Sequence, residues 1–438
     1  MKSFCVSVFA LLCIGAPVRA QERPLAFTGA TIIPISGPAM TDGVLVVHRG
    51  KIVAVGPKGS TRVPADAETV SVAGRVIMPG LIDSHSHIGS GSGADGSAPI
   101  QPDVRLLDGI NVRHPSIQRA QAGGITTVNV MPGSGHLLSG QTLYLKVRDG
   151  RTVDDLLIRD AGGRYLYGIK MANGTNPLRS GAAAGPFSGT RAKSAALVRE
   201  QFVRAEEYRE KVRRAGNDKT KQPPRDLGLE QLVDVLDRKL IVHFHTHRHD
   251  DIMTILRLQK EFGFRVVLHH VSEGYKVADE IARAGVGSSI IVLDSPGGKL
   301  ETMDFSSTNG AVLERVGALF GFHTDDYITD SRLFLRSAGM AVRYGMSRER
   351  ALYAMTMGNA RLLDLQDRVG SLEAGKDADF IILSGDPLSV YTHVLETYVE
   401  GVRVFNRADP QDKLYATGGY GAGRDEAVHF GCYEGEDY

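Results

Sequence analysis

Two kinds of hydrophobic pattern divide the 438-residue chain. Short runs rich in β-branched and aromatic residues, each bounded by turn residues, occur near both ends and predict antiparallel strands. These runs cover residues 26–35, 43–56, 70–78, 378–387 and 396–406. Because runs of the same character lie so far apart in the sequence, we expect one small β domain built from both ends of the chain.

Between the two ends, apolar strand-like segments alternate with helical patterns. This order is typical of βα units whose strands form a parallel sheet. Eight segments are candidate strands, at residues 81–87, 124–131, 142–147, 165–171, 240–246, 265–270, 287–293 and 318–324. Eight parallel strands suggest a closed barrel, and a TIM (β/α)8 barrel of ~250 residues fits the length of this region. The expected fold class is therefore α/β.

Two further segments complete the expected domain organisation. The charged segment from about 192 to 239 predicts a helix pair with a solvated face. Residues 409–438 are rich in Gly, Tyr and acidic residues but show no clear period, and they indicate no function. We therefore place the barrel in residues 80–369 and the small β domain in residues 21–79 and 370–408.

The N-terminus has the features of an export signal. Lys2 precedes an apolar run from Phe4 to Ile14, and small residues lead up to Ala20. This pattern predicts a signal peptide over residues 1–20 and a periplasmic or secreted mature protein. The apolar run is too short for a bilayer, and no later stretch approaches ~20 apolar residues, so we expect no stable membrane span.

Composition narrows the class of partner. The formal net charge is +1, with acidic and basic residues interspersed, so we expect no basic face that would attract nucleic acid. A small-molecule substrate is the expected partner, and a homo-oligomer is left open. Of the three cysteines only Cys432 lies outside the signal peptide, so the mature chain cannot form an internal disulfide.

The strongest local signal for chemistry is the segment MPGLIDSHSHIG, in which His85 and His87 follow a predicted strand. Side chains two residues apart share one face of a strand, so both imidazoles can point into the same space. TIM barrels place their active sites at the carboxyl ends of the strands. A His-x-His pair is common at surfaces, but further histidines recur here at the ends of other predicted strands.

The segment IVHFHTHRHDD supplies four histidines, not all of which can be metal ligands. His243 lies deepest in the predicted strand and is expected in the barrel interior. His245 lies near the strand end, where a metal could be reached. We expect His247 to lie beside the ligands or to face the substrate, and His249 to be an exposed loop residue.

Three other predicted strands, at residues 165–171, 265–270 and 318–324, supply further candidate site residues. The adjacent His269 and His270 are expected to point to opposite faces of their strand, so that only one can face the site. Asp325 follows the eighth predicted strand, where its carboxylate could bind metal and accept a proton. Asp326 is instead expected to interact with the N-terminus of the following helix. Lys170 lies within an apolar strand, where a bare ammonium is costly to bury.

These segments together resemble the amidohydrolase superfamily, from about residue 25 to residue 406. The opening VIMPGLIDSHSH and the closing GNARLLDLQDRVGSLEAGKDADFIIL carry the resemblance most specifically. Within the superfamily, the segments QAGGITTVNVMPGSG, GIKMANGTNP and HFHTHRHDDI look like the imidazolonepropionase-like branch, which includes prolidase-type dipeptidases. The resemblance implies a barrel plus a β-sandwich made from both termini.

The resemblance also implies a set of metal ligands, with Lys170 modified by CO₂ as a bridging ligand. The implied ligands are His85, His87, Lys170, His245, His270 and Asp325. The choice of His270 over His269 depends on registry with the segment VSEGYK. The branch contains one-metal and two-metal enzymes, so the resemblance allows either one or two metal ions in this site. A ligand set of nitrogen and oxygen without thiolate suits Zn²⁺ and tolerates Mn²⁺.

The expected activity is hydrolysis of an amide C–N bond by metal-activated water. The substrate would be a dipeptide, an N-acyl amino acid or a cyclic amide. Asp325 would carry the proton from water to the leaving nitrogen, and His247 would stabilise the developing oxyanion. The alternatives are an ester or phosphoester hydrolase on the same scaffold, and a periplasmic binding protein without catalysis.

Overall fold

The computed structural model describes residues 22–89, 95, 97–178, 189–292 and 299–418. The expected signal peptide and most of the segment 409–438 lie outside these residues. In the described part of the chain, no helix is long and apolar enough to cross a membrane.

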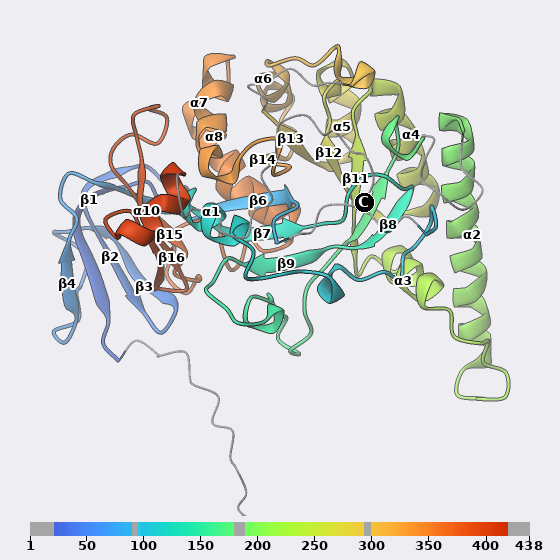
Figure 1. Ribbon diagram of the computed structural model, residues 1–438, viewed down its shortest axis with the longest axis horizontal. Coiled ribbons are helices and arrows are strands. Elements are labelled where there is room, and N and C mark those ends of the chain that lie inside the picture. The colour runs from blue at the N-terminus through green and yellow to red at the C-terminus, as the bar shows by residue number, and fades with distance from the viewer. Residues whose placement is uncertain (1–21, 90–94, 96, 179–188, 293–298, 419–438) are drawn as a thin grey trace, which may run out of the picture.

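One eight-stranded sheet contains segments from both ends of the chain, which lie side by side on the left of Figure 1. Its strands follow the order β17-β16-β15-β5-β1-β2-β3, and β4 pairs with β1. The strands are β1 Leu25–Ile32, β2 Met40–His48, β3 Lys51–Pro57, β4 Glu68–Ser71, β5 Val76–Pro79, β15 Phe380–Leu383, β16 Val394–Val399 and β17 Val402–Asn406. The expectation of antiparallel strands is wrong for two pairs, because β1 runs parallel to both β4 and β5.

Aromatic rings form the core on one face of this sheet. The rings of Phe380 and Tyr398 stack with centroids 4.4 Å apart, and Phe27 meets Phe380 edge-on at 5.0 Å. These residues come from strands at opposite ends of the sequence. Such aromatic contacts are worth about 0.5–1.5 kcal/mol beyond the burial of their area. They therefore help to hold the two chain ends together.

The middle of the chain forms two further sheets. A six-stranded sheet has the order β14-β13-β12-β11-β10-β8, and a three-stranded sheet has the order β6-β7-β9. The strands are β6 Leu81–Ser86, β7 Ile125–Val130, β8 Leu138–Gln141, β9 Leu143–Lys146, β10 Ile169–Ala172, β11 Ile241–Thr246, β12 Arg265–His270, β13 Gly287–Ile291 and β14 Phe320–His323. Strand pairs from β10 to β14 are parallel, as is the pair β6 and β7.

The third of the eight expected strands departs from the parallel arrangement. Residues 138–146 form β8 and β9 in succession, and β8 runs antiparallel to β10 while β9 runs antiparallel to β7. The expectation of eight parallel strands is therefore wrong at this position. At the other side of the arrangement, the backbone N–H of Asp325 donates to the carbonyl of His85 at 2.9 Å, which links the ends of β14 and β6.

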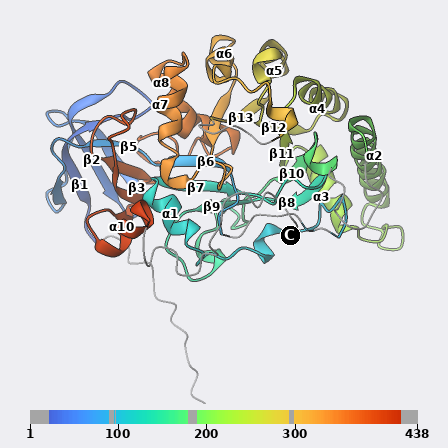
Figure 2. The same cartoon turned by 45° about the horizontal axis from the view of Figure 1, so that its top comes forward.

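Helices cover the outer side of the parallel strands, as Figure 2 shows for α4, α5 and α6 beside β11, β12 and β13. The helices are α1 Ser116–Ala122, α2 Arg191–Ala215, α3 Leu227–Leu236, α4 His249–Phe262, α5 Ala278–Ala284, α6 Asn309–Arg315, α7 Arg336–Arg343, α8 Arg348–Tyr353, α9 Asn359–Leu362 and α10 Pro410–Thr417. The charged segment 192–239 contains α2 and α3, as predicted. Helix α10 lies in the C-terminal segment whose sequence showed no period.

Local sequence explains where these helices begin and end. The Thr190 side chain accepts from the Lys193 N–H at the start of α2, and Asp226 does the same for Leu229 at α3. Such caps are typically worth about 1 kcal/mol. Helix α4 ends at Gly263, whose φ of +73° suits glycine.

A buried ionic cluster joins the eight-stranded sheet to β9. The Nζ atom of Lys146, a residue only 1% exposed, lies 2.9 Å from Asp377 and 2.5 Å from Asp379. Asp377 is also paired with Lys51 at 2.6 Å and with Arg368 at 3.2 Å. Asp377 and Asp379 lie three residues and one residue before β15, so this cluster connects the C-terminal segment to the central strands.

Candidate metal centre

Buried imidazoles and one buried lysine gather where the parallel strands end. They come from five strands and the residues directly after them: His85, His87, Lys170, His243, His245, His247, His269, His270, His323 and Asp325. All six ligands expected from the sequence belong to this group. Contacts between their side chains connect them into one cluster.

Asp325 lies against the two histidines of the first strand. Its Oδ1 atom is 3.0 Å from Nε2 of His87 and 3.3 Å from Nε2 of His85, and its Oδ2 is 3.8 Å from Nδ1 of His270. Burial by itself would raise the pKa of Asp325, but the hydrogen bond from His87 and nearby positive charges hold it below its usual value. The carboxylate is therefore charged and oriented toward the imidazoles.

Lys170 is fully buried at the centre of the cluster. Its Nζ atom lies 3.3 Å from Nε2 of His85 and 3.1 Å from the sulfur of Met131. Among the described residues, it forms no ion pair with a carboxylate. Burial lowers the pKa of Lys170 to about 7. A substantial fraction of neutral amine is therefore present at neutral pH, and the neutral amine is the form that can react with CO₂.

A second group consists of His245, His247 and His270, whose ring nitrogens include atoms within 4.8 Å of one another. Both ring nitrogens of His245 and Nε2 of His247 and of His270 are buried without a hydrogen-bond partner in the described residues. Buried polar atoms are rarely left unpaired. Burial lowers the pKa of all three histidines, so they are neutral and their lone pairs can bind a cation. The unpaired nitrogens of His245 and His270 fit a divalent metal.

The two adjacent histidines of β12 both face the cluster, which corrects the expectation that only one could. His269 Nδ1 is 3.2 Å from His85 Nδ1, and the rings of His270 and His85 have centroids 4.8 Å apart. His270 and Val271 have φ values of +70° and +51°. This backbone leaves the β conformation, so the alternation of faces stops at the strand end.

Behind His85 a chain of contacts continues into the interior. His269 Nε2 lies 2.9 Å from Nδ1 of His243, and His243 Nε2 lies 2.8 Å from the hydroxyl of Tyr144. His85 thus presents Nε2 to Asp325 and Lys170, and Nδ1 to His269. A metal-binding histidine usually donates its other N–H to such a partner, which fixes the ring orientation. His243 is an interior residue, as predicted.

His323 is a member of the cluster that the sequence reasoning did not single out. Its Nε2 atom is 3.2 Å from Nδ1 of His270, and its Nδ1 is 2.7 Å from the hydroxyl of Ser289. It forms a possible metal-holding group with His85 and His270. His323 precedes Asp325 by two residues, so the rule applied to His85 and His87 would have found it.

Two further residues lie at the edge of the site. Asp326 interacts with the start of a helix as expected, whereas the expectation that His249 lies in a loop is wrong, because a helix begins at this residue. His249 is the first residue of α4, is half exposed, and has Nδ1 2.6 Å from Glu273. Asp326 accepts a hydrogen bond from the N–H of Ser331, where a short 3-10 helix begins. Neither residue joins the cluster.

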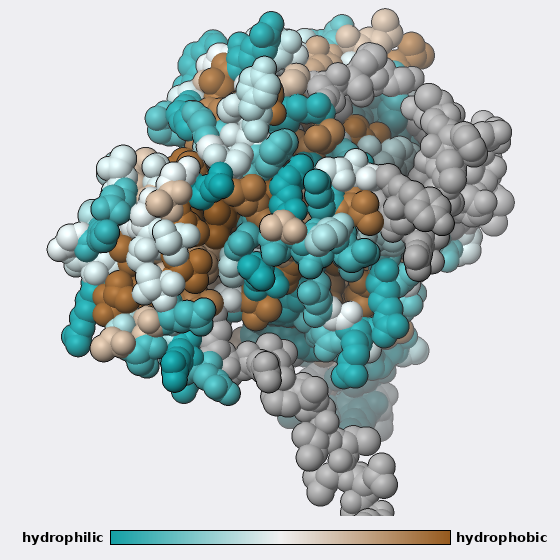
Figure 3. Space-filling model, turned by 60° about the vertical axis from the view of Figure 1, so that its left-hand side comes forward, coloured by the Kyte–Doolittle hydropathy of each residue, from teal (hydrophilic) through white to brown (hydrophobic). Residues whose placement is uncertain are grey.

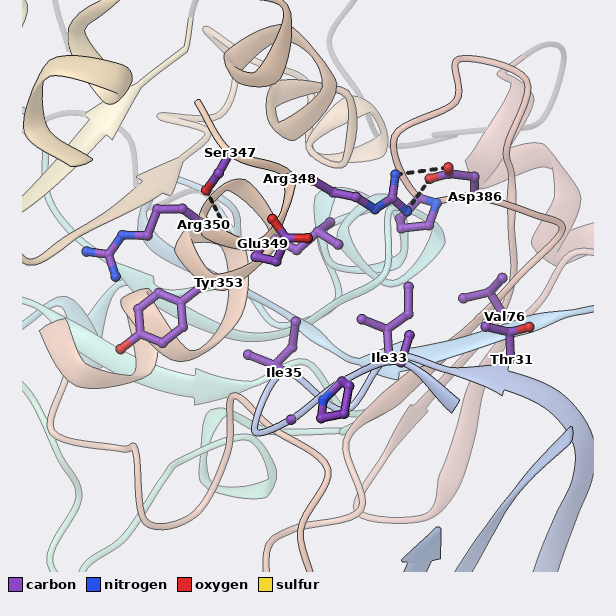
Figure 4. Close-up of a pocket in the computed structure, with 15 residues that line it drawn as sticks. Thr31, Ile33, Ile35, Val76, Ser347, Arg348, Glu349, Arg350, Tyr353 and Asp386 are labelled. Atoms are coloured by element: carbon purple, nitrogen blue, oxygen red, sulfur yellow. Dashed lines mark hydrogen bonds and ion pairs between the residues drawn. The ribbon is translucent and has the colours of Figure 1, made fainter. Parts of the chain in front are cut away.

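A separate cavity of about 800 Å³ lies beside α8, shown in Figure 4. Its lining includes Ile33, Ile35 and Tyr353, and an ion pair joins Arg348 to Asp386 at 2.7 Å. Patches of apolar side chains lie among polar ones on the side of the molecule shown in Figure 3. No residue of the histidine cluster lines the cavity, so it is not the candidate metal centre.

Known proteins of similar sequence and structure are amidohydrolases. The Amidohydrolase family matches residues 76–408. An amidohydrolase structure from Thermotoga maritima MSB8 is 34% identical and has a TM-score of 0.81, covering 87% of this chain and 100% of that chain.

Two curated relatives extend the comparison. Amidohydrolase tasK from Hapsidospora irregularis is 27% identical over 91% of this chain, but the chain covers only 43% of that protein. Imidazolonepropionase from Fusobacterium nucleatum subsp. nucleatum is 20% identical over 84% of this chain and 92% of that protein. The resemblance recognised in the sequence is confirmed, and the chain belongs to the amidohydrolase family.

Proposed function

We propose that this protein is a metal-dependent hydrolase that cleaves the C–N bond of a small amide. The observation that carries the proposal is the convergence of His85, His87, Lys170, His245, His270 and Asp325 at one end of the strands, with buried ring nitrogens that lack partners in the described residues. A purely structural cluster would be expected to pair these atoms. Family membership supports the same class of reaction.

The proposed architecture is a TIM barrel over residues 80–369 with a β-sandwich from residues 21–79 and 370–408. The strand order from β6 through β14 and the link between Asp325 and His85 support a closed arrangement. In such a barrel the carboxyl ends of the strands form the active-site face. We also propose that residues 1–20 direct export, which the intact mass of exported protein would test by a mature start at Gln21.

The proposed cofactor is one or two divalent ions, with Zn²⁺ as the first choice. His85, His87 and Asp325 would hold one ion, His245 and His270 would hold a second, and carboxylated Lys170 would be a further ligand. A bound ion of this kind lowers the pKa of water toward ~7 and polarises a carbonyl. Conversion of Lys170 to a carbamate would replace a buried positive charge by an anionic ligand with two oxygens.

Asp325 is the residue proposed to carry the proton. Its Oδ1 contacts His85 and His87, whereas its Oδ2 lies 3.8 Å from Nδ1 of His270. Oδ2 would take a proton from the attacking water and deliver it to the leaving nitrogen. The side chain is 19% exposed, so it reaches the space where a substrate would bind.

His247 is proposed to stabilise the negative charge that develops on the carbonyl oxygen. Its Nδ1 is 2.7 Å from the hydroxyl of Ser272. When that hydroxyl donates to Nδ1, the proton of the neutral ring is on Nε2, which has no partner in the described residues. Nε2–H is then available to donate to the substrate oxygen.

The direct test is metal analysis of the purified protein followed by a hydrolysis screen. The screen would contain dipeptides, N-acyl amino acids and cyclic amides, measured with metal-depleted and Zn²⁺-reloaded protein. We expect bound metal and metal-dependent release of an amine from at least one class. Stoichiometric metal without cleavage of any class would contradict amide hydrolysis, and cleavage of esters alone would favour the ester hydrolase.

A further inference from the structure

Glu301 lies next to the proposed site but is not among its expected residues. It belongs to a short 3-10 helix at Leu300–Thr302 and is 3% exposed. Its Oε1 atom is 4.0 Å from Nε2 of His247. The His247 ring in turn stacks on His270 with centroids 4.8 Å apart and meets His245 at 4.7 Å. Only the His247 ring therefore separates Glu301 from the proposed metal ligands His245 and His270 in the described residues.

The orientation of the Glu301 carboxylate is determined by its surroundings. The N–H of Thr175 donates to Oε2 at 2.7 Å. Gly174 allows this approach, because a Cβ at that position would lie 2.5 Å from Oε2, and its φ of +79° also favours glycine. Arg191 lies 3.6 Å from Oε2 and 2.8 Å from Asp251, so it balances both carboxylates.

These contacts occupy one oxygen of Glu301 and leave the other unpaired. Oε1 has no hydrogen-bond partner among the described residues, although it is buried. The same is true of Nε2 of His247. A carboxylate oxygen can only accept a hydrogen bond, whereas Nε2–H of the neutral imidazole can donate one. The site thus presents a donor and an acceptor 4.0 Å apart, beside the proposed metal ligands.

We propose that Glu301 binds a free amino group adjacent to the scissile carbonyl, while His247 donates to the carbonyl oxygen. This inference rests on the proposed amide hydrolysis and narrows its substrate to aminoacyl amides, such as dipeptides with a free N-terminus. In an α-amino amide the carbonyl oxygen and the amino nitrogen are three bonds apart, roughly 3 Å by standard bond lengths. They can therefore contact the two protein atoms at the same time.

The charge of the substrate group that contacts Glu301 determines which substrates fit the site. A protonated amine brings three N–H donors and a positive charge to the Oε1 atom of Glu301, which has no hydrogen-bond partner among the described residues. Charge-assisted hydrogen bonds are about twice as strong as neutral ones. An N-acyl amino acid carries a neutral amide or no nitrogen at this position. It would leave Oε1 without a charged partner in a buried site.

The test uses substrates that differ only in the amine. Alanyl and propionyl derivatives of the same leaving amine, across several leaving amines, would be compared by kcat/KM with Zn²⁺-loaded protein. We expect wild type to prefer the alanyl member by about 100-fold, and Glu301→Gln to reduce that preference by at least about 10-fold. Glu261→Gln is the control, because Glu261 is an exposed partner of Arg199 on α4.

The possible results distinguish the role of Glu301 in amine binding from the proposed amide hydrolysis. Cleavage of both members with equal kcat/KM, or an unchanged preference in folded Glu301→Gln, would overturn the role of Glu301 and leave amide hydrolysis standing. Cleavage of neither member by loaded wild type, together with inactivity throughout the wider amide screen, would overturn both. If Glu301→Gln does not fold, Glu301→Asp is the second variant. It withdraws the carboxylate by one methylene group and should also reduce the alanyl preference, and an unchanged preference in it would overturn the role of Glu301.

Discussion

Two buried polar regions of this protein differ in how completely their atoms are paired. At the junction of the eight-stranded sheet with β9, Lys146 contacts both Asp377 and Asp379 within 3 Å, and Asp377 has further cationic partners. In the histidine cluster, both ring nitrogens of His245 and one oxygen of Glu301 have no partner in the described residues. Lys146, Asp377, Asp379, His245 and Glu301 are all buried.

The difference indicates what each region is for. Leaving a buried polar group unpaired costs about 1–3 kcal/mol, so folding alone gives no reason to retain several such groups in one place. The junction satisfies its own charges and needs no ligand. In the histidine cluster, we propose that a cation and a substrate supply the missing partners. Substitutions at the junction should therefore change stability, and substitutions in the cluster should change binding and turnover.

The largest expected effect is on turnover, from Asp325→Asn. The amide keeps the shape of the side chain but cannot take up a proton, so kcat should fall by about 10²–10⁴-fold with little change in thermal stability. The adjacent Asp326→Asn is the control and should keep near-normal kcat, because Asp326 accepts from the N–H of Ser331 and lies outside the histidine cluster. A normal kcat in Asp325→Asn would show that another group carries the proton.

The matching substitution at the junction is Lys146→Met. It leaves two buried carboxylates without their shared cation, and breaking a buried ion pair typically costs about 3–5 kcal/mol of unfolding free energy. Denaturant titration should detect this loss, while the metal content of the folded protein should not change. Lys58→Met removes an exposed lysine 4.0 Å from Asp42 and should cost less than about 1 kcal/mol. Equal losses in the two variants would contradict the comparison.

A smaller effect is expected from His269→Gln, which interrupts the chain behind His85. Loss of an outer partner of a metal ligand typically lowers metal affinity by about 10–100-fold. Competition with a chelator would measure this change without reference to activity. His249→Gln alters a half-exposed histidine bonded to Glu273 and should leave metal affinity unchanged. An unaltered metal affinity in His269→Gln would show that the contacts from His269 to Tyr144 serve packing only.

The smallest effect concerns acid stability at the junction. Burial alone would raise the pKa of Asp377, but Lys146 and Lys51 outweigh it and lower the pKa to about 2. A pKa below the unfolded value stabilises the fold above pH ~4, and this contribution disappears as the pH falls through about 2. The stability difference between wild type and Asp377→Asn should therefore shrink by roughly 2 kcal/mol over that interval. A pH-independent difference would contradict the assignment.

The sequence allowed the positions of the central strands to be predicted except that of β8, but not every strand direction. Each of the eight expected segments overlaps a strand of the central sheets, because apolar runs with turn residues mark strands locally. The direction of β9 depends on its pairing with β7, which is a tertiary contact. No hydrophobic period distinguishes a parallel from an antiparallel strand, so this feature could not be read from the chain.

The same distinction applies to the site. His85, His87 and Asp325 were recognisable because they follow strands that end at one face. The positive φ of His270 has no signature in the residue types around it, so the inward orientation of both His269 and His270 was missed. Glu301 reaches the site from a turn after β13 rather than from a strand end, and no local spacing connects it to His247.

We propose that metal ions supply the missing partners of the unpaired His245 and His270 nitrogens. A crystal structure of Zn²⁺-loaded protein, with anomalous diffraction to locate the ions, tests this proposal. We predict ions held by His85, His87 and Asp325 and by His245 and His270, with added density on the Lys170 amine wherever two ions are present. A bare Lys170 beside one ion would reduce the site to a single-metal centre. Zinc bound only elsewhere, with the cluster empty, would contradict the account.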